Sequence, residues 1–164
     1  MDQGISSLEI PGYDLNLVNH GRGKGLATYY TDQFQAAGAI NKDFYQIAKV
    51  SSAEFDVINV YCSHGLNTVE FLRDLGSLAG SMKTGFIIGD FNVDFLHEPK
   101  AAIVRKILSH GFKQMVSHPT HMEGGLLDHA YHKGLSWEPI ADLHFPYYSD
   151  HALISIRRLD SNCD

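Results

Sequence analysis

Residues 84–92 read TGFIIGDFN, and this stretch decides the fold more than any other part of the chain. Its apolar run is typical of a strand buried at the centre of a sheet. Asp90 and Asn92 follow where the strand leaves the core. Because side chains two residues apart in an extended segment face the same way, we expect this carboxylate and amide to converge on one phosphate or one attacking water. The competing interpretation of an isolated pair is a turn that caps the strand.

Strand and helix signals alternate around this stretch. Short aromatic and β-branched segments predict strands at 25–30, 44–50 and 55–62 before it, and at 112–116, 126–132, 136–143 and 151–159 after it. Asn67 can cap a helix with Glu70 three residues on, and the apolar spacing predicts that this helix ends by Gly80. Pro99 is expected to open a second helix, which Gly111 ends. These signals predict an α+β fold, with a mixed or antiparallel sheet sandwich covered by helices.

Length and composition favour one folded domain over residues 1–164. The chain has 164 residues, of which 44% are hydrophobic and 20% charged, so it can bury one ordinary core. No window approaches the ~18 apolar residues of a membrane span, and the first ten residues have no secretion signal pattern. The two cysteines are too few for a disulfide framework or a four-cysteine zinc site. We therefore expect an intracellular protein without a membrane partner.

The formal net charge of -6 excludes one class of function. It offers no general attraction to polyanions, so it argues against a protein that coats nucleic acid through a basic surface. An enzyme that cleaves a phosphodiester can still be acidic, because its carboxylates hold divalent cations that then meet the phosphate.

Asp128, Asp150 and His151 are the second group of candidate residues. Asp150 and His151 lie between an aromatic loop and a predicted strand, which places a possible metal ligand beside an imidazole suited to acid/base work. An aspartate such as Asp128, accepting a hydrogen bond from one imidazole nitrogen, would fix the tautomer and raise the basicity of the other nitrogen. Each feature alone is also explained by a turn at a strand end.

Taken together, these motifs resemble a known superfamily. GDFN (89–92), PTH (119–121) with LLDHAY (126–131), and YSDHALI (148–154) occur in the order and approximate spacing of the last three signatures of the deoxyribonuclease I-like, or endonuclease/exonuclease/phosphatase, superfamily. The upstream segments IPGYDLNLVNHGRGKGLATYY (10–30) and FDVINVYCSHG (55–65) resemble those of non-LTR retrotransposon endonucleases. The resemblance covers roughly residues 10 to 159.

The resemblance implies a fold and an activity. The fold would be a β-sandwich flanked by helices. The activity would be Mg²⁺- or Mn²⁺-dependent hydrolysis of phosphodiesters, with DNA as the first choice of substrate, a nick as the product and the nucleus as the location. Phosphoinositides, sphingolipids and protein–DNA adducts are substrates elsewhere in the superfamily.

The family's roles can be transferred to matching positions. Asp90 would orient or deprotonate the attacking water and share in metal binding, with Asn92 holding the water or the phosphate. Asp150 resembles the metal-associated aspartate. His151 resembles the histidine that stabilises charge on the scissile phosphate, with Asp128 as its orienting partner. Tyr61 would be a tyrosine on the phosphate side.

The chain departs from the family at its beginning. Family members carry an Asn and the principal metal-binding Glu on two strands upstream of the Gly-Tyr segment, and this chain starts too late to contain them; Glu9 is at most a poor substitute. We therefore expect a truncated domain with unpaired sheet edges, which invites a homodimer or a complementing polypeptide. The alternative function is a catalytically impaired module that binds nucleic acid or a protein.

Other side chains offer weaker signals. The pairs His118/His121 and His129/His132 have spacings that could hold zinc, although histidines of a solvated or packed strand face explain them better. Tyr148, beside the candidate site, could stack on a base. Arg22 and Lys24 could contact backbone phosphate, and a solvated hairpin tip explains them equally well.

Overall fold

The computed structural model describes residues 9–19 and 25–159 of the protein, which hold ten strands and two helices. Along the chain the elements are β1 (Asp14–Asn19), β2 (Gly25–Tyr30), β3 (Gln35–Lys42), β4 (Tyr45–Ser51), β5 (Asp56–Cys62), α1 (Thr68–Ala79), β6 (Gly85–Asp90), α2 (Ala102–Ser109), β7 (Lys113–Gln114), β8 (Asp128–Lys133), β9 (Pro139–His144) and β10 (Leu153–Arg158).

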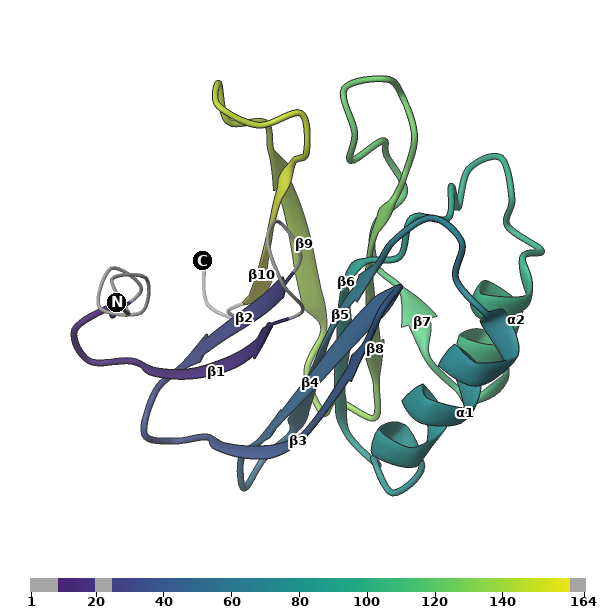
Figure 1. Ribbon diagram of the computed structural model, residues 1–164. Helices are drawn as coiled ribbons and strands as arrows, with labels where there is room; N and C mark the ends of the chain where they lie inside the picture. Colours follow the sequence, from purple (N-terminus) through teal and green to yellow (C-terminus); the bar gives the residue numbers. More distant parts are fainter. Residues whose placement is uncertain (1–8, 20–24, 160–164) are drawn as a thin grey trace, which may run out of the picture.

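A six-stranded mixed sheet forms the centre of the molecule (Figure 1). Its strand order is β3-β4-β5-β6-β8-β7. Neighbouring strands run antiparallel except β5 and β6, which are parallel and joined through α1. The apolar run that ends in Asp90 therefore occupies a central strand, as its composition predicts.

Both helices cover one face of this sheet (Figure 1). The core on this side contains Ile58 and Ile87 from the sheet, Phe71 from α1 and Ile107 from α2, all nearly or fully buried. Asn67 caps α1, since its side-chain oxygen accepts hydrogen bonds from the backbone N–H groups of Val69 and Glu70, both at 3.1 Å. Neither of the helices found in the described ranges is long and apolar enough to cross a membrane.

Two separate antiparallel ribbons lie on the opposite face. One is β1 with β2, and the other is β9 with β10. Val18 and Leu26 of the first pack with Ala48 of β4, and Ile154 and Ile156 of the second pack against Ala130 of β8. The molecule is thus a sandwich of one continuous sheet, two ribbons on its inner face and two helices on its outer face.

The sequence expectations for these elements are mostly confirmed, with three corrections. β1 and β3 are strands that the sequence analysis did not predict. β3, with the sequence QAAGAINK, has little strand propensity of its own and is held by pairing with β4. The second helix begins at Ala102, three residues after the expected start, because Pro99 lies in a turn that is closed by a hydrogen bond from Ala101 N–H to the carbonyl of Glu98.

Candidate active site

Tyr61, Asp90 and Asp128 form a row across three neighbouring strands. Tyr61 of β5 pairs with Asp90 of β6, which in turn pairs with Asp128 of β8. Ile88, two residues before Asp90, and Ala130, two residues after Asp128, pack with the β9–β10 ribbon. Side chains two residues apart on a strand share a face, so both carboxylates are on the ribbon face. β6 ends and β8 begins at this row. The sheet thereby brings Tyr61 close to Asp128, although the two residues are 67 positions apart in the sequence.

Gly89 allows β6 to run close beside β5 at this point. Its φ is 138°, a value that disfavours any residue with a side chain. A Cβ atom at this position would overlap the carbonyl oxygen of Val60. The glycine of GDFN is therefore required by the backbone that carries Asp90.

His151 joins the row from the loop that leads into β10. Its Nδ1 lies 2.8 Å from Asp128 Oδ2, the hydrogen bond that the sequence analysis expected. The backbone N–H of His151 also donates to Ser149 Oγ at 3.1 Å. Because Nδ1 is engaged by the carboxylate, Nε2 is the ring nitrogen available to a ligand.

Asp150 stands at the outer rim of the same group, with 68% of its side chain exposed. Its Oδ2 lies 3.3 Å from His121 Nε2. His121 Nδ1 accepts a hydrogen bond from the backbone N–H of Glu123, so in the neutral ring the proton is on Nε2 and faces Asp150. The sequence places His121 in the PTH motif and in a possible zinc pair, but does not predict this contact.

Thr120 is a second residue that the sequence analysis missed. Its side chain is fully buried, and its Oγ1 accepts hydrogen bonds from the backbone N–H groups of Leu127 and Asp128 at 3.0 and 2.9 Å. Its carbonyl accepts from Ala152 N–H at 2.7 Å. Thr120 thus fastens the start of β8 to the segment carrying His151. Its place in the PTH motif (119–121) is the signal that the sequence offers for Thr120.

Asn92 does not continue an extended segment, which corrects one expectation. Its φ of 52° places it in a left-handed turn, and its backbone N–H donates to Asp90 Oδ1 at 2.9 Å. Its side-chain amide donates to the carbonyl of Cys62 at 3.4 Å. The pair forms the capping turn that was the competing interpretation. This turn fixes the Asp90 carboxylate and holds Asn92 beside the end of β5.

The charges in this group perturb one another. Burial and the nearby carboxylate of Asp128 raise the pKa of Asp90, although the Asn92 N–H and the ring of His151 oppose this shift. Burial would lower the pKa of His151, but the hydrogen bond to Asp128 and the charges of Asp128 and Asp90 outweigh it, so the pKa is raised. The arrangement favours a cationic imidazole beside two carboxylates.

The same residues suit a divalent cation. Ligand atoms of Asp90, Asp128 and His151 all lie within 4.8 Å of one another, and so do those of His121, Asp150 and His151. Carboxylate oxygens are the ligands that Mg²⁺ and Mn²⁺ prefer. Since Asp90 and Asp128 repel each other, a cation between them would relieve an unfavourable charge interaction. The donor set therefore fits the expected metal.

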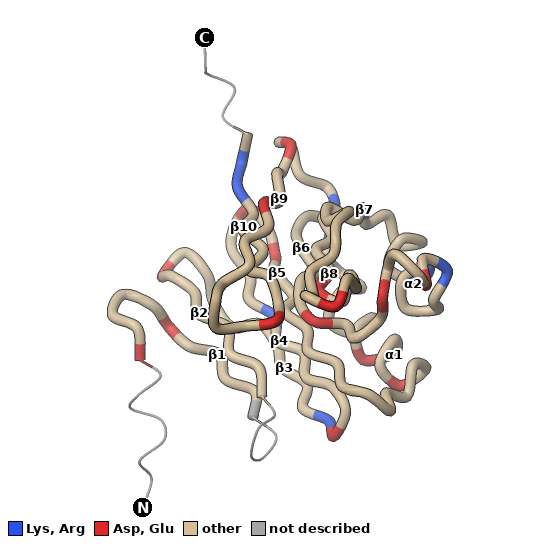
Figure 2. Tube along the Cα trace, turned by 90° about the horizontal axis from the view of Figure 1, so that it is seen from above, with Lys and Arg blue, Asp and Glu red and all other residues tan. Residues whose placement is uncertain are grey.

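Two exposed aromatic side chains lie in a loop next to the site. Tyr147 and Tyr148, in the loop between β9 and β10, are 101% and 78% exposed and contact each other edge to face. Seen from above in Figure 2, acidic positions gather over the loops at this end of the sheet, whereas Lys and Arg lie mainly toward the margins. Arg22 and Lys24, expected to contact phosphate, lie outside the described residues.

The geometry does not support a zinc site at the pair His129/His132. His129 is fully buried, stacks on Phe91 with ring centroids 4.9 Å apart, and lies 2.8 Å from both the Tyr131 hydroxyl and the Val93 carbonyl. Because His129 and His132 are three residues apart on β8, they face opposite sides of the sheet. His129 is a core residue of the helix-covered side.

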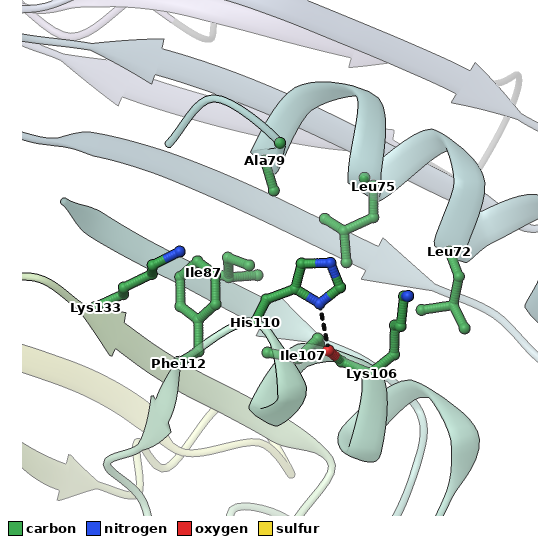
Figure 3. Close-up of a pocket in the computed structure, with 11 residues that line it drawn as sticks. Leu72, Leu75, Ala79, Ile87, Lys106, Ile107, His110, Phe112 and Lys133 are labelled. Atoms are coloured by element: carbon green, nitrogen blue, oxygen red, sulfur yellow. Dashed lines mark hydrogen bonds between the residues drawn. The ribbon is translucent and has the colours of Figure 1, made fainter. Parts of the chain in front are cut away.

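An apolar pocket of about 70 Å³ lies on that helix-covered side, away from the carboxylates (Figure 3). Leu72 and Leu75 of α1, Ile107 of α2 and Phe112 line it. His110 Nδ1 hydrogen-bonds the Lys106 carbonyl at its edge, at 2.7 Å. No acidic side chain is among the lining residues in the described part of the chain, so this pocket is a gap between helices and sheet rather than part of the site.

Comparisons with known proteins identify the fold. No protein-family model and no curated protein sequence matches the chain. Among solved structures, it is similar to the endonuclease domain of TRAS1, a telomere-specific non-LTR retrotransposon, with 9% identity and a TM-score of 0.68 over 90% of this chain and 78% of that one. It is also similar to CdtB, the biologically active subunit of cytolethal distending toxin, with 11% identity and a TM-score of 0.54 over 91% and 75% of the two chains. A third similar structure is the Haemophilus ducreyi cytolethal distending toxin, with 16% identity and a TM-score of 0.56 over 90% and 75%.

These likenesses confirm the fold expected from the motifs. The chain has the α+β fold of these structures, a sheet sandwich flanked by helices, as the resemblance of the motifs implied. At 9% to 16% identity they show the fold alone. What the site does must therefore be argued from its own residues.

Proposed function

We propose that this protein is a divalent-metal-dependent phosphodiesterase that nicks DNA. The observation that carries the proposal is the row of Asp90 and Asp128 with His151 bonded to Asp128 at 2.8 Å, at the loop end of a deoxyribonuclease I-like sheet. Partly buried carboxylates beside a cationic imidazole have perturbed pKa values, and such groups concentrate where chemistry is done.

Asp90 acts as the base in this proposal. The oxygen of a water attacks phosphorus and transfers a proton to the Asp90 carboxylate. The turn formed with Asn92 holds that carboxylate in place through the 2.9 Å hydrogen bond. The bond from phosphorus to the 3′ oxygen breaks, and that oxygen takes a proton from solvent. The products are a 3′-hydroxyl and a 5′-phosphate.

His151 stabilises the charge that develops on the phosphate. Asp128 keeps the imidazole protonated and oriented, so that Nε2 can donate to a phosphate oxygen. Asp90 and Asp128, whose ligand atoms lie within 4.8 Å of each other, would hold Mg²⁺ or Mn²⁺, with Asp150 at the rim of the site; the cation would supply positive charge at the scissile phosphate when bound. Tyr61, next to Asp90 in the strand register, would lie on the phosphate side.

The similar endonuclease structure and the residues around the site favour DNA as the substrate. The similar TRAS1 structure is an endonuclease domain, which supports a nucleic acid over a lipid. Tyr147 and Tyr148 present aromatic rings to solvent beside Asp150, as a base-stacking contact requires. The net charge of -6 leaves little attraction to phosphate without the metal, so binding as well as cleavage should need the cation.

Nicking of supercoiled plasmid tests the proposal. We expect nicking with Mg²⁺ or Mn²⁺, none with EDTA, and loss of nicking in Asp90→Asn and His151→Ala. Asp142→Asn, an exposed carboxylate of β9 that pairs with Arg157, is the matched control and should nick normally. DNA binding without nicking in the wild type would favour the impaired binding module instead.

A further inference from the structure

The pocket between the two helices and the central sheet has an apolar interior and a mouth lined by exposed residues (Figure 3). Leu75 of α1, Ile107 of α2 and Phe112 line the interior, and each is at most 4% exposed. Gly76 and His110 line the mouth. About 10–15 Å³ of such volume accommodates one water-sized group, so the 70 Å³ of this pocket accommodates roughly five to seven. The pocket therefore fits a short apolar chain.

Gly76 leaves free space over the mouth of the pocket. It lies inside α1, and a Cβ atom added there would contact nothing within 4 Å. Its φ is not among the positive values that favour glycine. Glycine is one of the least favourable residues in a helix interior. The residue therefore has no conformational role in the helix, and its effect is to leave the pocket accessible.

Two lysines border the same pocket without a carboxylate partner. Neither Lys106 of α2 nor Lys133 of β8 lies within 4.0 Å of an acidic oxygen among the residues that the structure describes. Lys133 instead places its ammonium 5.4 Å from the centre of the Phe112 ring. Lys42 and Lys49, in contrast, each pair with a carboxylate. Two such cations beside an apolar interior, in a protein of net charge -6, suit the anionic head of an otherwise apolar ligand.

His110 adds a third nitrogen to this group. Its Nδ1 lies 2.7 Å from the carbonyl oxygen of Lys106. A carbonyl only accepts hydrogen bonds, so Nδ1 carries the proton and Nε2 is the ring nitrogen available to a ligand. In the view of Figure 3 the ring stands between the amino groups of Lys106 and Lys133. The polar atoms of the pocket therefore gather on one side of its apolar interior.

The helix ends around the pocket limit the charge of the ligand. The lining residues of α1 and α2 include the last turn of each helix. Each helix C-terminus carries about half a negative charge, so the two ends together offset about one of the two ammonium charges. With the His110 ring neutral, a net positive charge of about one is left at the mouth. A head group with a single negative charge matches this balance.

We propose that this pocket, which we call the α1–α2 pocket, binds a small amphipathic monoanion, namely a carboxylate with an unbranched apolar tail of about five to seven carbons. The tail lies against Leu75, Ile107 and Phe112, where each methylene removed from water tightens binding about fourfold. The carboxylate oxygens accept hydrogen bonds from the ammonium groups of Lys106 and Lys133.

The α1–α2 pocket is separate from the candidate active site. Ile87 of β6, which also lines it, belongs to the core on the helix side, whereas Asp90 of the same strand lies on the ribbon face. Binding in the pocket can therefore be measured without DNA or metal. The inference does not depend on the proposed nuclease activity, and the failure of one would leave the other standing.

Methyl NMR of the full chain, titrated with octanoate in buffer with EDTA, tests the inference. Resonances of Leu75, Ile87 and Ile107 should shift in a saturable way, while those of Ile154 on the ribbon side stay unchanged. Acetate, which lacks the tail, and octanamide, which lacks the charge, should each bind at least about tenfold more weakly. Equal binding of octanamide would mean an apolar gap without selectivity for an anion. That result, or no saturable shift with octanoate up to about 5 mM, overturns the proposal.

Variants make the test specific to the pocket. Lys106→Met combined with Lys133→Met removes both charges but keeps apolar side chains, and Gly76→Leu fills the free space at the mouth while favouring the helix. Each should weaken octanoate binding at least about tenfold. Lys113→Met and Ser77→Leu make the same changes at exposed positions outside the lining, and should bind as the wild type does. Unchanged octanoate binding in either pocket variant overturns the assignment.

Discussion

Asp128 Oδ2 lies 2.8 Å from His151 Nδ1, and this hydrogen bond joins the central sheet to the β9–β10 ribbon. Thr120 fixes the backbone of Asp128, because its buried hydroxyl accepts a hydrogen bond from the Asp128 backbone N–H. The imidazole is therefore positioned by the same contacts that fasten the two layers of the sandwich together.

Asp128→Asn should lower the pKa of His151, because the variant removes the charge that favours the imidazolium. An NMR titration of the His151 ring in metal-free buffer would show the shift, with Asp142→Asn as the unshifted control. We expect nicking to fall by about 10²- to 10³-fold, on the scale seen when one stabilising group is removed from an active site. An unchanged His151 titration would contradict the assigned partner.

Asp90→Asn should stabilise the protein while it abolishes nicking. The raised pKa means that the ionised carboxylate is disfavoured in the folded state, so the wild-type free energy of unfolding falls as pH rises above the ordinary aspartate range. Asparagine keeps the acceptor for the Asn92 N–H without the charge. Urea unfolding at neutral pH with EDTA should show a gain of about 0.5–2 kcal/mol. A less stable variant would mean that Asp90 has a structural role.

Tyr148→Ala should weaken DNA binding without affecting the fold, because the ring is 78% exposed. Loss of one stacked base costs about 1–3 kcal/mol, which is roughly a 5- to 150-fold loss of affinity. Fluorescence anisotropy with a labelled oligonucleotide and Ca²⁺ would measure it. Phe145→Ala, which removes a 48% exposed ring from the same loop, offers the comparison. Equal affinity of Tyr148→Ala and wild type would exclude a stacking role.

His129 should make the protein less stable in mild acid. Burial lowers its pKa, so the folded state keeps the ring neutral while the unfolded chain binds a proton below about pH 6.5. The free energy of unfolding then falls as pH drops through this window, by up to about 1.4 kcal/mol per pH unit for one proton. His129→Phe retains the stacking shape against Phe91 but does not titrate. Its unfolding free energy, measured by urea titration, should show a smaller pH slope than the wild type; equal slopes would contradict the prediction.

Strong local signals made much of this molecule predictable. The apolar run before Asp90, the Asn67 cap and the β2 strand lie where the sequence placed them. The Asp128–His151 contact was expected from the resemblance of the motifs and not from their spacing. β3 had no such signal, because its strand conformation depends on β4 and on a close contact of Gly38 with Leu78.

The predictions that were wrong or missing concern contacts between residues distant in the sequence. Asn92 was expected to be extended, yet its backbone turns to donate to Asp90. The contact of His121 with Asp150 requires an isolated bridge between residues 121 and 151, which no local pattern encodes. The burial of His129 against Phe91 likewise follows from which face of β8 meets the helices. Local spacing cannot distinguish a ligand from a core residue in such cases.

A double-mutant cycle on plasmid nicking tests the central claim most directly, namely that Asp128 and His151 act as one unit in phosphodiester cleavage. Initial nicking rates would be compared for the wild type, Asp128→Asn, His151→Ala and the double variant, with Mg²⁺ and with EDTA. We predict Mg²⁺-dependent nicking that each single variant lowers about as far as the double variant does, because removing either partner disables the pair. Effects that multiply, or nicking that survives both substitutions, would contradict the account.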